Sequence, residues 1–410
     1  MATVMIITLG TGREVESGIA KSIHTNNPDK IYFIATNESL ATISRIEKEL
    51  GRKLVYEQPY LVKNPEDVEK CWQTTAQLIR SLLQAGYAPA EICLDFTSGT
   101  KAMSAGAVLA GVSLECGYLS YVGGGERDAT GRVITGTERV ITLTPNAVFI
   151  DHRRQLIRNF FNTFQYDSCL KLIEEAQTRV VYPELYREFG QLEDLVHAYS
   201  WWDKFDHQKA ASSFRLLREF KARWRIDTSD SKEMVFKISR QQEKYASGGN
   251  IKDKFSQEVL ADLLANADRR AQEGKYDDAV ARLYRAVEVV AQMLLAQRGI
   301  DTAAVKMEQL PHDWRETYRE IEPPIRLGQE KAFALLESLG EETGRIYREN
   351  SNLRNYLAKR NSSILAHDLE PMTREIYEHL SREANQLALK AVPRLDSLKA
   401  KCRFPLLELT

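Results

Sequence analysis

The sequence has few cysteines, no long apolar run and almost no net charge. Its five cysteines are scattered and include no Cys-x-x-Cys pair, which favours reduced thiols over a disulfide framework or a zinc site. The longest apolar run, near Ala105–Leu114, is too short to cross a bilayer. The first residues, Met1–Ile7, lack the basic start and the cleavage site of a signal peptide. We therefore expect a cytoplasmic protein with no membrane segment and no metal or other cofactor.

The charge and the glycine motifs argue against several classes of nucleotide-binding protein. The formal net charge of −1 argues against an overall basic coat, although it is compatible with a local basic groove. No segment reads as a helix-turn-helix with a basic recognition helix, so stable DNA binding is not expected. Gly10-Thr11-Gly12 is not completed by the third glycine of a dinucleotide fingerprint, because Val15 stands there, and no Walker A motif is present.

The 410 residues exceed one typical domain, and their patterning divides them into three predicted parts. Residues 1–145 alternate short apolar strands with helices, which predicts a parallel, Rossmann-like α/β domain. Amphipathic helices dominate after that, and Ala246–Asn250 is the best linker among them. We therefore expect an all-α connector over residues 146–250 and an all-α helical bundle over residues 251–410.

Two segments of the predicted connector are weakly similar to each other. Phe160–Ala176 and Trp201–Phe220 each space their apolar residues as a helix does. Each also contains an aromatic–Asp step, Tyr166-Asp167 in the first and Phe205-Asp206 in the second. They resemble helical-hairpin repeats, but two copies are too few to predict a solenoid.

Two predicted strand ends are suited to a phosphate-bearing ligand. Asp95–Met103 joins a strand end to a helix start, where ligands bind in open α/β sheets and where the first free amides of the helix attract an anion. Gly99 would let a phosphate approach the backbone, and a similar turn follows the first strand. The candidate ligand residues are Gly10, Thr11, Gly12, Thr97, Ser98, Gly99, Thr100 and Lys101. A plain helix cap made by Thr97 or Ser98 is the structural alternative.

A predicted break between helices near the C-terminus combines groups suited to phosphodiester cleavage. Arg360 and His367 stand seven positions apart, and Asn361 follows the arginine. Arg360 can hold the scissile phosphate by two hydrogen bonds, His367 can move protons near neutral pH, and Asn361 can orient the histidine or hold a phosphate oxygen. An RNA that supplies its own 2′-OH as nucleophile needs no metal, and the expected product is a 2′,3′-cyclic phosphate. The alternatives are an arginine that complements a helix dipole and a histidine in a structural hydrogen bond.

A second arginine–histidine pair lies nearby. Arg374 and His379 fall inside the predicted helix Met372–Val392, five positions apart. At about 3.6 residues per turn their side chains diverge around the helix. We therefore interpret this pair as part of a solvated face.

The Asp95–Met103 junction reads Asp-Phe-Thr-Ser-Gly-Thr-Lys-x-Met and resembles the signature of CARF domains, the CRISPR-associated Rossmann-like sensors. The turn Thr8–Gly12 resembles the first ligand loop of that family. CARF domains dimerise and bind cyclic oligoadenylates made by type III CRISPR complexes. The resemblance implies a cyclic tetra- or hexa-adenylate activator, held in a two-fold pocket that would be lined by Thr11, Gly12, Thr97, Gly99, Thr100 and Lys101.

The Arg360–His367 segment resembles the Arg-x(4–6)-His motif of HEPN ribonucleases, and Leu283–Glu288 resembles part of the first long helix of that bundle. HEPN sites are composite, so the resemblance implies a homodimer in which both protomers contribute Arg360 and His367. One departure is Asp368, which stands where many family members carry glycine. An acid at this position would raise the pKa of the histidine or fix its orientation.

The order CARF then HEPN in one chain is the architecture of type III CRISPR accessory ribonucleases. The resulting hypothesis is a cyclic-oligoadenylate-activated, metal-independent endoribonuclease that cleaves single-stranded RNA in antiviral defence. The alternative is a non-catalytic cyclic-nucleotide sensor whose helical bundle dimerises or binds a partner.

Overall fold

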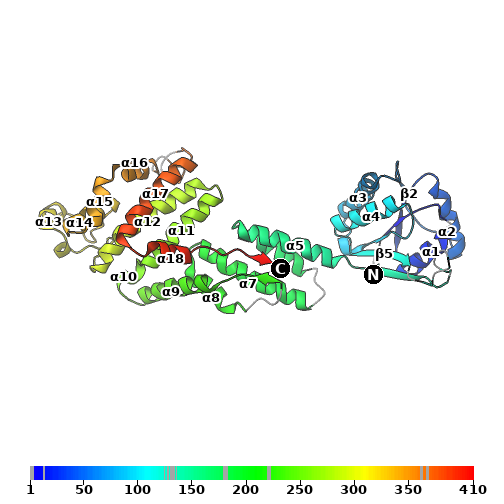
Figure 1. Ribbon diagram of the computed structural model, residues 1–410, viewed down its shortest axis with the longest axis horizontal. Helices are drawn as coiled ribbons and strands as arrows, with labels where there is room; N and C mark the ends of the chain where they lie inside the picture. Colours follow the sequence, from blue (N-terminus) through cyan, green and yellow to red (C-terminus); the bar gives the residue numbers. More distant parts are fainter. Residues whose placement is uncertain are drawn as a thin grey trace. The chain divides into compact units, whose positions relative to one another are not determined.

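The computed structural model contains two compact units, residues 1–153 and 154–410, and the division falls within helix α5 (Asn146–Asn162) (Figure 1). The structure describes residues 4–12, 14–123, 125–126, 129, 134, 136–178, 183–218, 223–360, 363–365 and 369–410. A mixed, mostly parallel sheet lies in the first unit, and the second is largely helical. The expected order of an α/β region followed by helices is therefore confirmed.

The sheet of the first unit has six strands in the order β3-β2-β1-β4-β5-β6. Its first five strands in the chain run parallel, and β6 pairs antiparallel with β5 at the edge. The strands are β1 (Val4–Thr8), β2 (Lys30–Ala35), β3 (Tyr60–Leu61), β4 (Ile92–Asp95), β5 (Tyr118–Gly123) and β6 (Arg139–Leu143).

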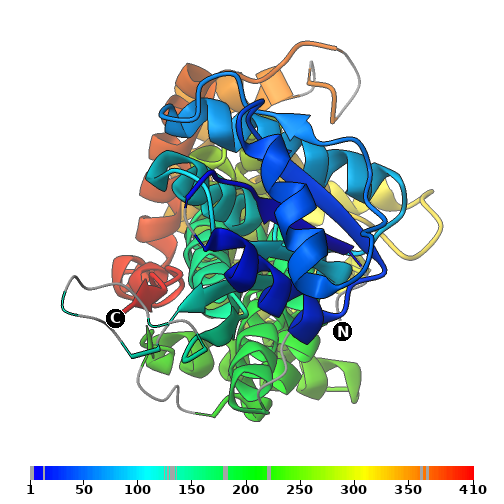
Figure 2. The ribbon, with the colours of Figure 1, turned by 90° about the vertical axis from the view of Figure 1, so that its right-hand side faces the viewer.

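Helices cover both faces of this sheet, as Figures 1 and 2 show. The helices of this unit are α1 (Val15–Asn26), α2 (Thr42–Leu50), α3 (Val68–Gln84) and α4 (Lys101–Ser113). Alternate residues of β1 serve the two faces: Val4 and Ile6 pack in the core with α3 and α4, whereas Met5 and Ile7 pack with α1 and α2. All of β1 is buried, as a central parallel strand requires.

The strand order reverses between β1 and β4. The chain proceeds outward from β1 to β3 on one side, then returns to β4 and proceeds outward on the other. The loops that follow β1 and β4 therefore lie side by side at the carboxyl ends of two adjacent central strands. Open α/β sheets bind ligands at such a crossing point, and both predicted ligand loops lie there.

The second unit is built from helices and one short pair of strands. Its helices after the shared α5 are α6 (Tyr166–Gln177), α7 (Pro183–Asp203), α8 (His207–Leu216), α9 (Ser229–Ala246), α10 (Ile251–Lys254), α11 (Gln257–Gln272), α12 (Tyr276–Gln297), α13 (His312–Tyr318), α14 (Gln329–Ser338), α15 (Glu342–Glu349), α16 (Ser351–Lys359), α17 (Arg374–Ala391) and α18 (Leu395–Lys401). The strands β7 (Trp224–Arg225) and β8 (Glu408–Leu409) pair antiparallel. Within the described ranges, no helix is long and apolar enough to cross a membrane.

The same tight turn recurs after helices of the second unit, and three examples follow α5, α7 and α11. Phe164, Phe205 and Gly274 each adopt a positive φ, of 62°, 65° and 74°, directly after a helix. In each turn the next amide donates to the carbonyl five positions back, at 2.8, 2.9 and 2.9 Å, which closes the helix end. The turns at Phe164 and Phe205 therefore break the segments Phe160–Ala176 and Trp201–Phe220. The two aromatic–Asp steps are not equivalent, because Tyr166 follows its turn residue by two positions whereas Phe205 is itself the turn residue.

The turn at Gly274 joins α11 to α12, beyond the predicted linker Ala246–Asn250. The linker itself does separate two helices, α9 and α10. It does not separate two compact units, because residues 154–410 form one. The boundaries expected at residues 145 and 250 stay predictions.

A buried ionic cluster connects α7 and α8 to α11. Asp203, at the end of α7, accepts a hydrogen bond from Arg269 Nε at 3.0 Å and pairs with Arg270. His207 of α8 contacts Asp262 Oδ2 through Nε2 at 2.7 Å. These five side chains are nearly or fully buried. Buried charges require such partners, so the cluster holds the two sets of helices in one arrangement.

Candidate functional site

The loops after β1 and β4 touch each other through their backbones. The Gly10 amide donates to Ser98 Oγ at 3.0 Å. A Cβ on Gly10 would stand 2.6 Å from the Gly99 amide nitrogen, so only glycine fits there. Gly99 has a φ of +101°, a conformation that L side chains rarely adopt. The two glycines let the loops approach closely enough to form one surface.

The predicted hydroxyl ligands take part in holding this surface together. Thr97 Oγ1 accepts a hydrogen bond from the Val122 amide at 2.9 Å. Thr100 Oγ1 accepts from the Met103 amide at 3.1 Å, as the cap of α4, and donates to the Pro65 carbonyl. The expected helix cap is therefore present, at Thr100 rather than at Thr97 or Ser98. These contacts position the loop, whatever else the hydroxyls bind.

The groups left facing outward are mostly backbone and one cation. Thr11, Gly12 and Lys101 are exposed. Helix geometry leaves the amides of Lys101 and Ala102, in the first turn of α4, without intrahelical acceptors. The N-terminal end of α4 carries a partial positive charge. The loops thus offer N–H donors and an ammonium group to an anionic ligand.

The buried carboxyl group of Asp95 holds the loop after β4 in place through a hydrogen bond. Asp95 accepts from Ser22 Oγ at 2.5 Å and from the Thr97 amide at 2.9 Å. Burial raises the pKa of Asp95, and the hydrogen bonds from Ser22 and Thr97 oppose that rise. Asp95 belongs to the sequence motif, whereas Ser22 carries no sequence signal, because it lies 73 residues earlier in the chain and contacts Asp95 only through the fold.

Arg360 lies directly after α16 and against the side of α12. Its guanidinium carbon is 4.8 Å from the centroid of the Tyr284 ring. Its Nε is buried and, among the described residues, has no hydrogen-bond partner. Burial raises the pKa of Tyr284, with Glu288 adding to the rise and Arg360 opposing it. The neutral ring therefore holds the face of the guanidinium.

The remaining predicted cleavage residues, Asn361 and His367, lie outside the described residues, as does Asp368. Arg360 falls between α16 and α17, so the predicted break between helices is confirmed. Ser363 and Glu370 form a bridge that brings together two described parts of the segment. The structure thus places Arg360 and leaves its pairing with His367 a prediction.

The second arginine–histidine pair belongs to the surface of α17. Arg374 is paired with Glu378 at 2.7 Å, and its side chain is 76% exposed. His379 lies 4.0 Å from Glu375 and stacks on Tyr356 with a centroid distance of 5.1 Å. Each member interacts with its own carboxylate. The interpretation of this pair as a solvated face is confirmed.

Family comparisons match most of the second unit. The description "Csm6 6H domain" matches residues 150–243, and "Csm6 HEPN domain" matches residues 249–390. The chain belongs to the Csm6 family. The two matched segments of this Csm6-family chain meet at the predicted linker, and the predicted family of CRISPR-associated ribonucleases is confirmed.

A curated relative and a solved structure agree with this family. The chain is 24% identical over 408 residues to the "CRISPR system endoribonuclease Csm6" of Thermus thermophilus, covering 94% of this chain and 84% of that protein. It matches the fold of Enterococcus italicus Csm6 bound to cyclic hexa-2′-fluoro-hexa-dAMP with a TM-score of 0.60 at 13% identity, over 98% of this chain and 100% of that one. These matches disfavour the non-catalytic alternative.

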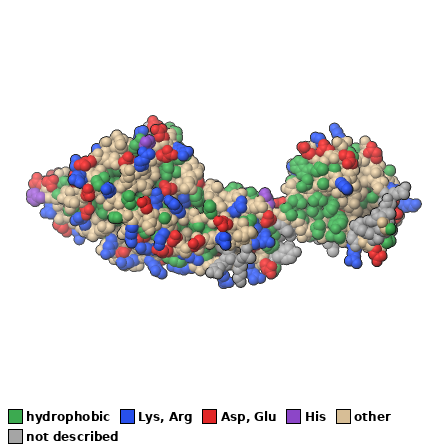
Figure 3. Space-filling view, viewed as in Figure 1, with side chains coloured by type: hydrophobic (Ala, Val, Ile, Leu, Met, Phe, Trp, Pro, Cys, Tyr) green, Lys and Arg blue, Asp and Glu red, His purple; other side chains and the backbone are tan. Residues whose placement is uncertain are grey.

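No metal-ligating cluster of three or more His, Cys, Asp or Glu side chains occurs in the part of the chain that the structure describes. Charged side chains of both signs are interspersed over the face of the second unit seen in Figure 3. This face carries no continuous basic coat, so recognition of an anionic polymer would depend on individual clusters of cations.

Proposed function

We propose that the protein is a cyclic-oligoadenylate-activated endoribonuclease that cleaves single-stranded RNA without a metal ion. The observation that carries the proposal is the position of Arg360. Its guanidinium lies on the Tyr284 ring, its Nε has no partner among the described residues, and it stands at the start of the segment that leads to His367. Arginine held in this way is suited to binding a phosphate through two N–H groups.

In the proposed reaction the RNA 2′-OH attacks the adjacent phosphorus and the 5′-oxygen of the next nucleotide leaves. Arg360 binds the non-bridging oxygens, where negative charge increases in the transition state. His367 transfers the proton from the attacking oxygen or to the leaving oxygen, and Asn361 orients the histidine or holds a phosphate oxygen. The products are a 2′,3′-cyclic phosphate and a 5′-hydroxyl.

The activator would bind at the loops after β1 and β4. The central position of these strands, with the order 3-2-1-4-5 of a Rossmann-like sheet, supports a ligand site at their ends. Gly10, Gly12 and Gly99 allow close approach of the ligand, and Lys101 and the first amides of α4 supply positive charge. The Enterococcus italicus relative binds a cyclic hexa-adenylate analogue. A cyclic tetra- or hexa-adenylate is accordingly the proposed ligand here.

The proposed active unit is a homodimer. Exposed apolar side chains lie within and just after the cleavage segment, namely Ile364 at 62%, Leu365 at 48% and Leu369 at 80%. Clustered apolar residues on a surface favour association. A second copy covering them would bring two Arg360/His367 pairs together.

The test is cleavage of a fluorescent single-stranded RNA reporter by the purified protein in the presence of EDTA. Cyclic tri-, tetra- and hexa-adenylates are added separately. One ring size should raise the rate strongly, and mass spectrometry should find the cyclic phosphate end. Equal rates with and without every ring would refute activation, and loss of activity in EDTA that Mg²⁺ restores would refute the metal-free mechanism.

A further inference from the structure

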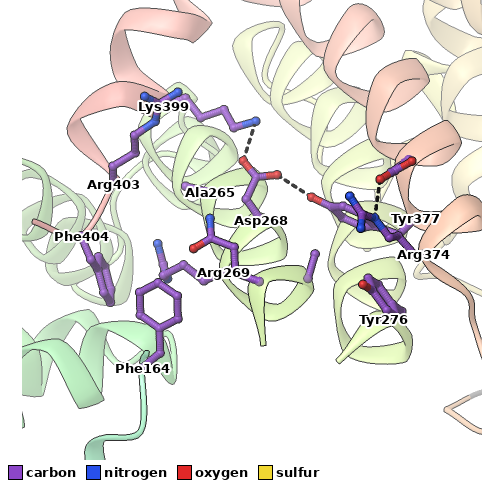
Figure 4. A pocket seen from close by; sticks show the side chains of 13 residues that line it. Phe164, Ala265, Asp268, Arg269, Tyr276, Arg374, Tyr377, Lys399, Arg403 and Phe404 are labelled. Atoms are coloured by element: carbon purple, nitrogen blue, oxygen red, sulfur yellow. Dashed lines mark hydrogen bonds and ion pairs between the residues drawn. The ribbon is translucent and has the colours of Figure 1, made fainter. Parts of the chain in front are cut away.

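A cavity of about 740 Å³ lies within the second unit, apart from Arg360 (Figure 4). Its walls come from α11, α12, α17, and α18 with the residues that follow it. The residues used in the argument below are Asp268, Tyr276, Arg374, Tyr377, Lys399 and Arg403. The volume is within the usual range for a small-molecule site and is sufficient for a nucleotide.

The charges around this cavity leave an excess of positive charge. Asp268 is neutralised by Lys399, whose Nζ lies 2.9 Å from Oδ2. The Tyr377 hydroxyl donates to the other oxygen of Asp268 at 2.8 Å. Arg374 pairs with Glu378 at the rim, where both side chains are more than half exposed. Such exposed pairs contribute little free energy, so a phosphate can compete with Glu378 for the arginine.

Arg403 supplies the unbalanced charge. It is exposed, and among the described residues its guanidinium has neither an ion-pair nor a hydrogen-bond partner. Figure 4 shows it on the same side of the cavity as Lys399, whereas Arg374 lies near Tyr377. Two arginines able to bind a phosphate therefore border the same cavity.

The cavity also contains aromatic rings. Tyr276 and Tyr377 lie with their centroids 6.2 Å apart and their planes tilted by 39°. Aromatic rings beside cations are the common elements of sites that bind single-stranded nucleic acid without base specificity. The combination favours a nucleotide over a simple inorganic anion.

The cavity is connected to the cleavage region through α12. Tyr276 begins that helix, and Tyr284, which carries Arg360 on its ring, follows eight residues later. Eight residues of helix span about 12 Å, roughly the length of three to four stacked nucleotides. The Met372 amide also donates to Asp277 Oδ1 at 3.2 Å, which ties the end of the cleavage segment to the start of α12.

We propose that this cavity binds the part of the single-stranded RNA that flanks the scissile phosphate, with a base against Tyr276 or Tyr377 and successive phosphates on Arg374 and Arg403. The inference rests on the proposed function, since it assigns a second contact to the same substrate. A cyclic oligoadenylate has the same chemistry, so the experiment must separate the two.

The first measurement is binding, in which no cleavage is needed. Fluorescence anisotropy follows a short labelled RNA added to the full-length Arg360→Ala protein, with or without Arg403→Glu. We expect Arg403→Glu to weaken binding about tenfold at low salt and to reduce the salt slope by about one. Arg403→Lys should retain most of the affinity. The matched control is Arg326→Glu, which reverses an exposed arginine outside the cavity lining.

The second measurement is cleavage by the activated protein that retains Arg360. Arg403→Glu should raise KM for a long RNA and leave kcat, as well as the cleavage of a dinucleotide, unchanged. Equal effects of Arg403→Glu and Arg326→Glu on RNA binding would overturn the proposal. The proposal would also be overturned if Arg403→Glu abolished cyclic-oligoadenylate binding while RNA binding stayed intact. A change in the oligomeric state of Arg403→Glu on size exclusion would overturn it as well. If the wild-type protein cleaves nothing but Arg403 still governs RNA binding, the cleavage proposal fails and the binding site stands.

Discussion

The two units build their candidate sites from different chemical groups. In the first unit the ligand loops meet through glycine backbone, and Ser98, Thr97 and Thr100 use their hydroxyls to hold the loops. In the second unit the proposed site depends on one described side chain, Arg360, placed on an aromatic ring. A site made of backbone tolerates most side-chain changes, whereas a site made of one guanidinium does not.

The interiors of the two units also differ in the kind of side chain that they bury. The sheet of the first unit is enclosed by apolar side chains on both faces. The second unit contains Asp203, Arg269, Arg270, His207 and Asp262 in a buried cluster. Apolar packing is non-directional, whereas hydrogen-bonded charges accept few alternative arrangements. The second unit is therefore the part in which single charged residues should matter most.

Arg360→Ala should have the largest effect. It removes the proposed phosphate ligand, and we expect the cleavage rate to fall about a thousandfold, or about 4 kcal/mol of transition-state stabilisation. His367→Ala should have a similar effect, and the double variant should be little worse than either single one, because the two residues act together. The measurement is kcat with activator bound.

The matched control for that change is His379→Ala, which alters the solvated pair on α17. It should cleave RNA at the normal rate. Calorimetric binding of the cyclic oligoadenylate should be unchanged in all these variants. If Arg360→Ala cleaved RNA at the normal rate, the proposed site of the second unit would not depend on this side chain, and the contrast between the two units would be wrong.

Asp203→Ala should have the next largest effect, on stability. It leaves Arg269 and Arg270 buried without their main partner, which costs about 3 kcal/mol or more. Asp167→Ala is the control, because its pair with Lys204 is exposed and should contribute about 0.5 kcal/mol or less. Urea unfolding of the full chain gives both values. Similar midpoints for the two variants would show that the buried cluster is not the stronger restraint.

A feature could be predicted from the sequence when the residues that form it lie close together in the chain. The junction after Ile92–Asp95 was predictable because its glycine, cap and strand are local signals. The ionic cluster was not, since Asp203 and Arg269 are 66 positions apart and neither residue looks unusual alone. The turns at Phe164 and Phe205 were missed because phenylalanine rarely adopts a positive φ. The turn at Gly274 carries the usual signal, a glycine.

The backbone-built site should respond to Gly99→Ala. Gly99 has a φ of +101°, and the added methyl group would meet the Met103 side chain at 3.1 Å. We expect the affinity for the cyclic oligoadenylate to fall about thirtyfold, or about 2 kcal/mol, because the strained loop no longer presents its amides correctly. Gly51→Ala is the control: it also has a positive φ, but nothing lies within 4 Å of the new methyl group. An equal loss of affinity in both variants would contradict this interpretation of the loop.

Thr100→Ala should have the smallest effect, and it tests whether the hydroxyls of the loop hold the fold or the ligand. The change removes the cap of α4 and the bond to the Pro65 carbonyl, and we expect unfolding of the first unit to be easier by about 1 kcal/mol. Thr100→Ser should recover most of this, because the hydroxyl is kept. If Thr100→Ala instead abolished ligand binding while the unfolding midpoint stayed normal, the hydroxyl would have to touch the ligand directly. The ligand site of the first unit would then depend on a single side chain, as we propose for the second.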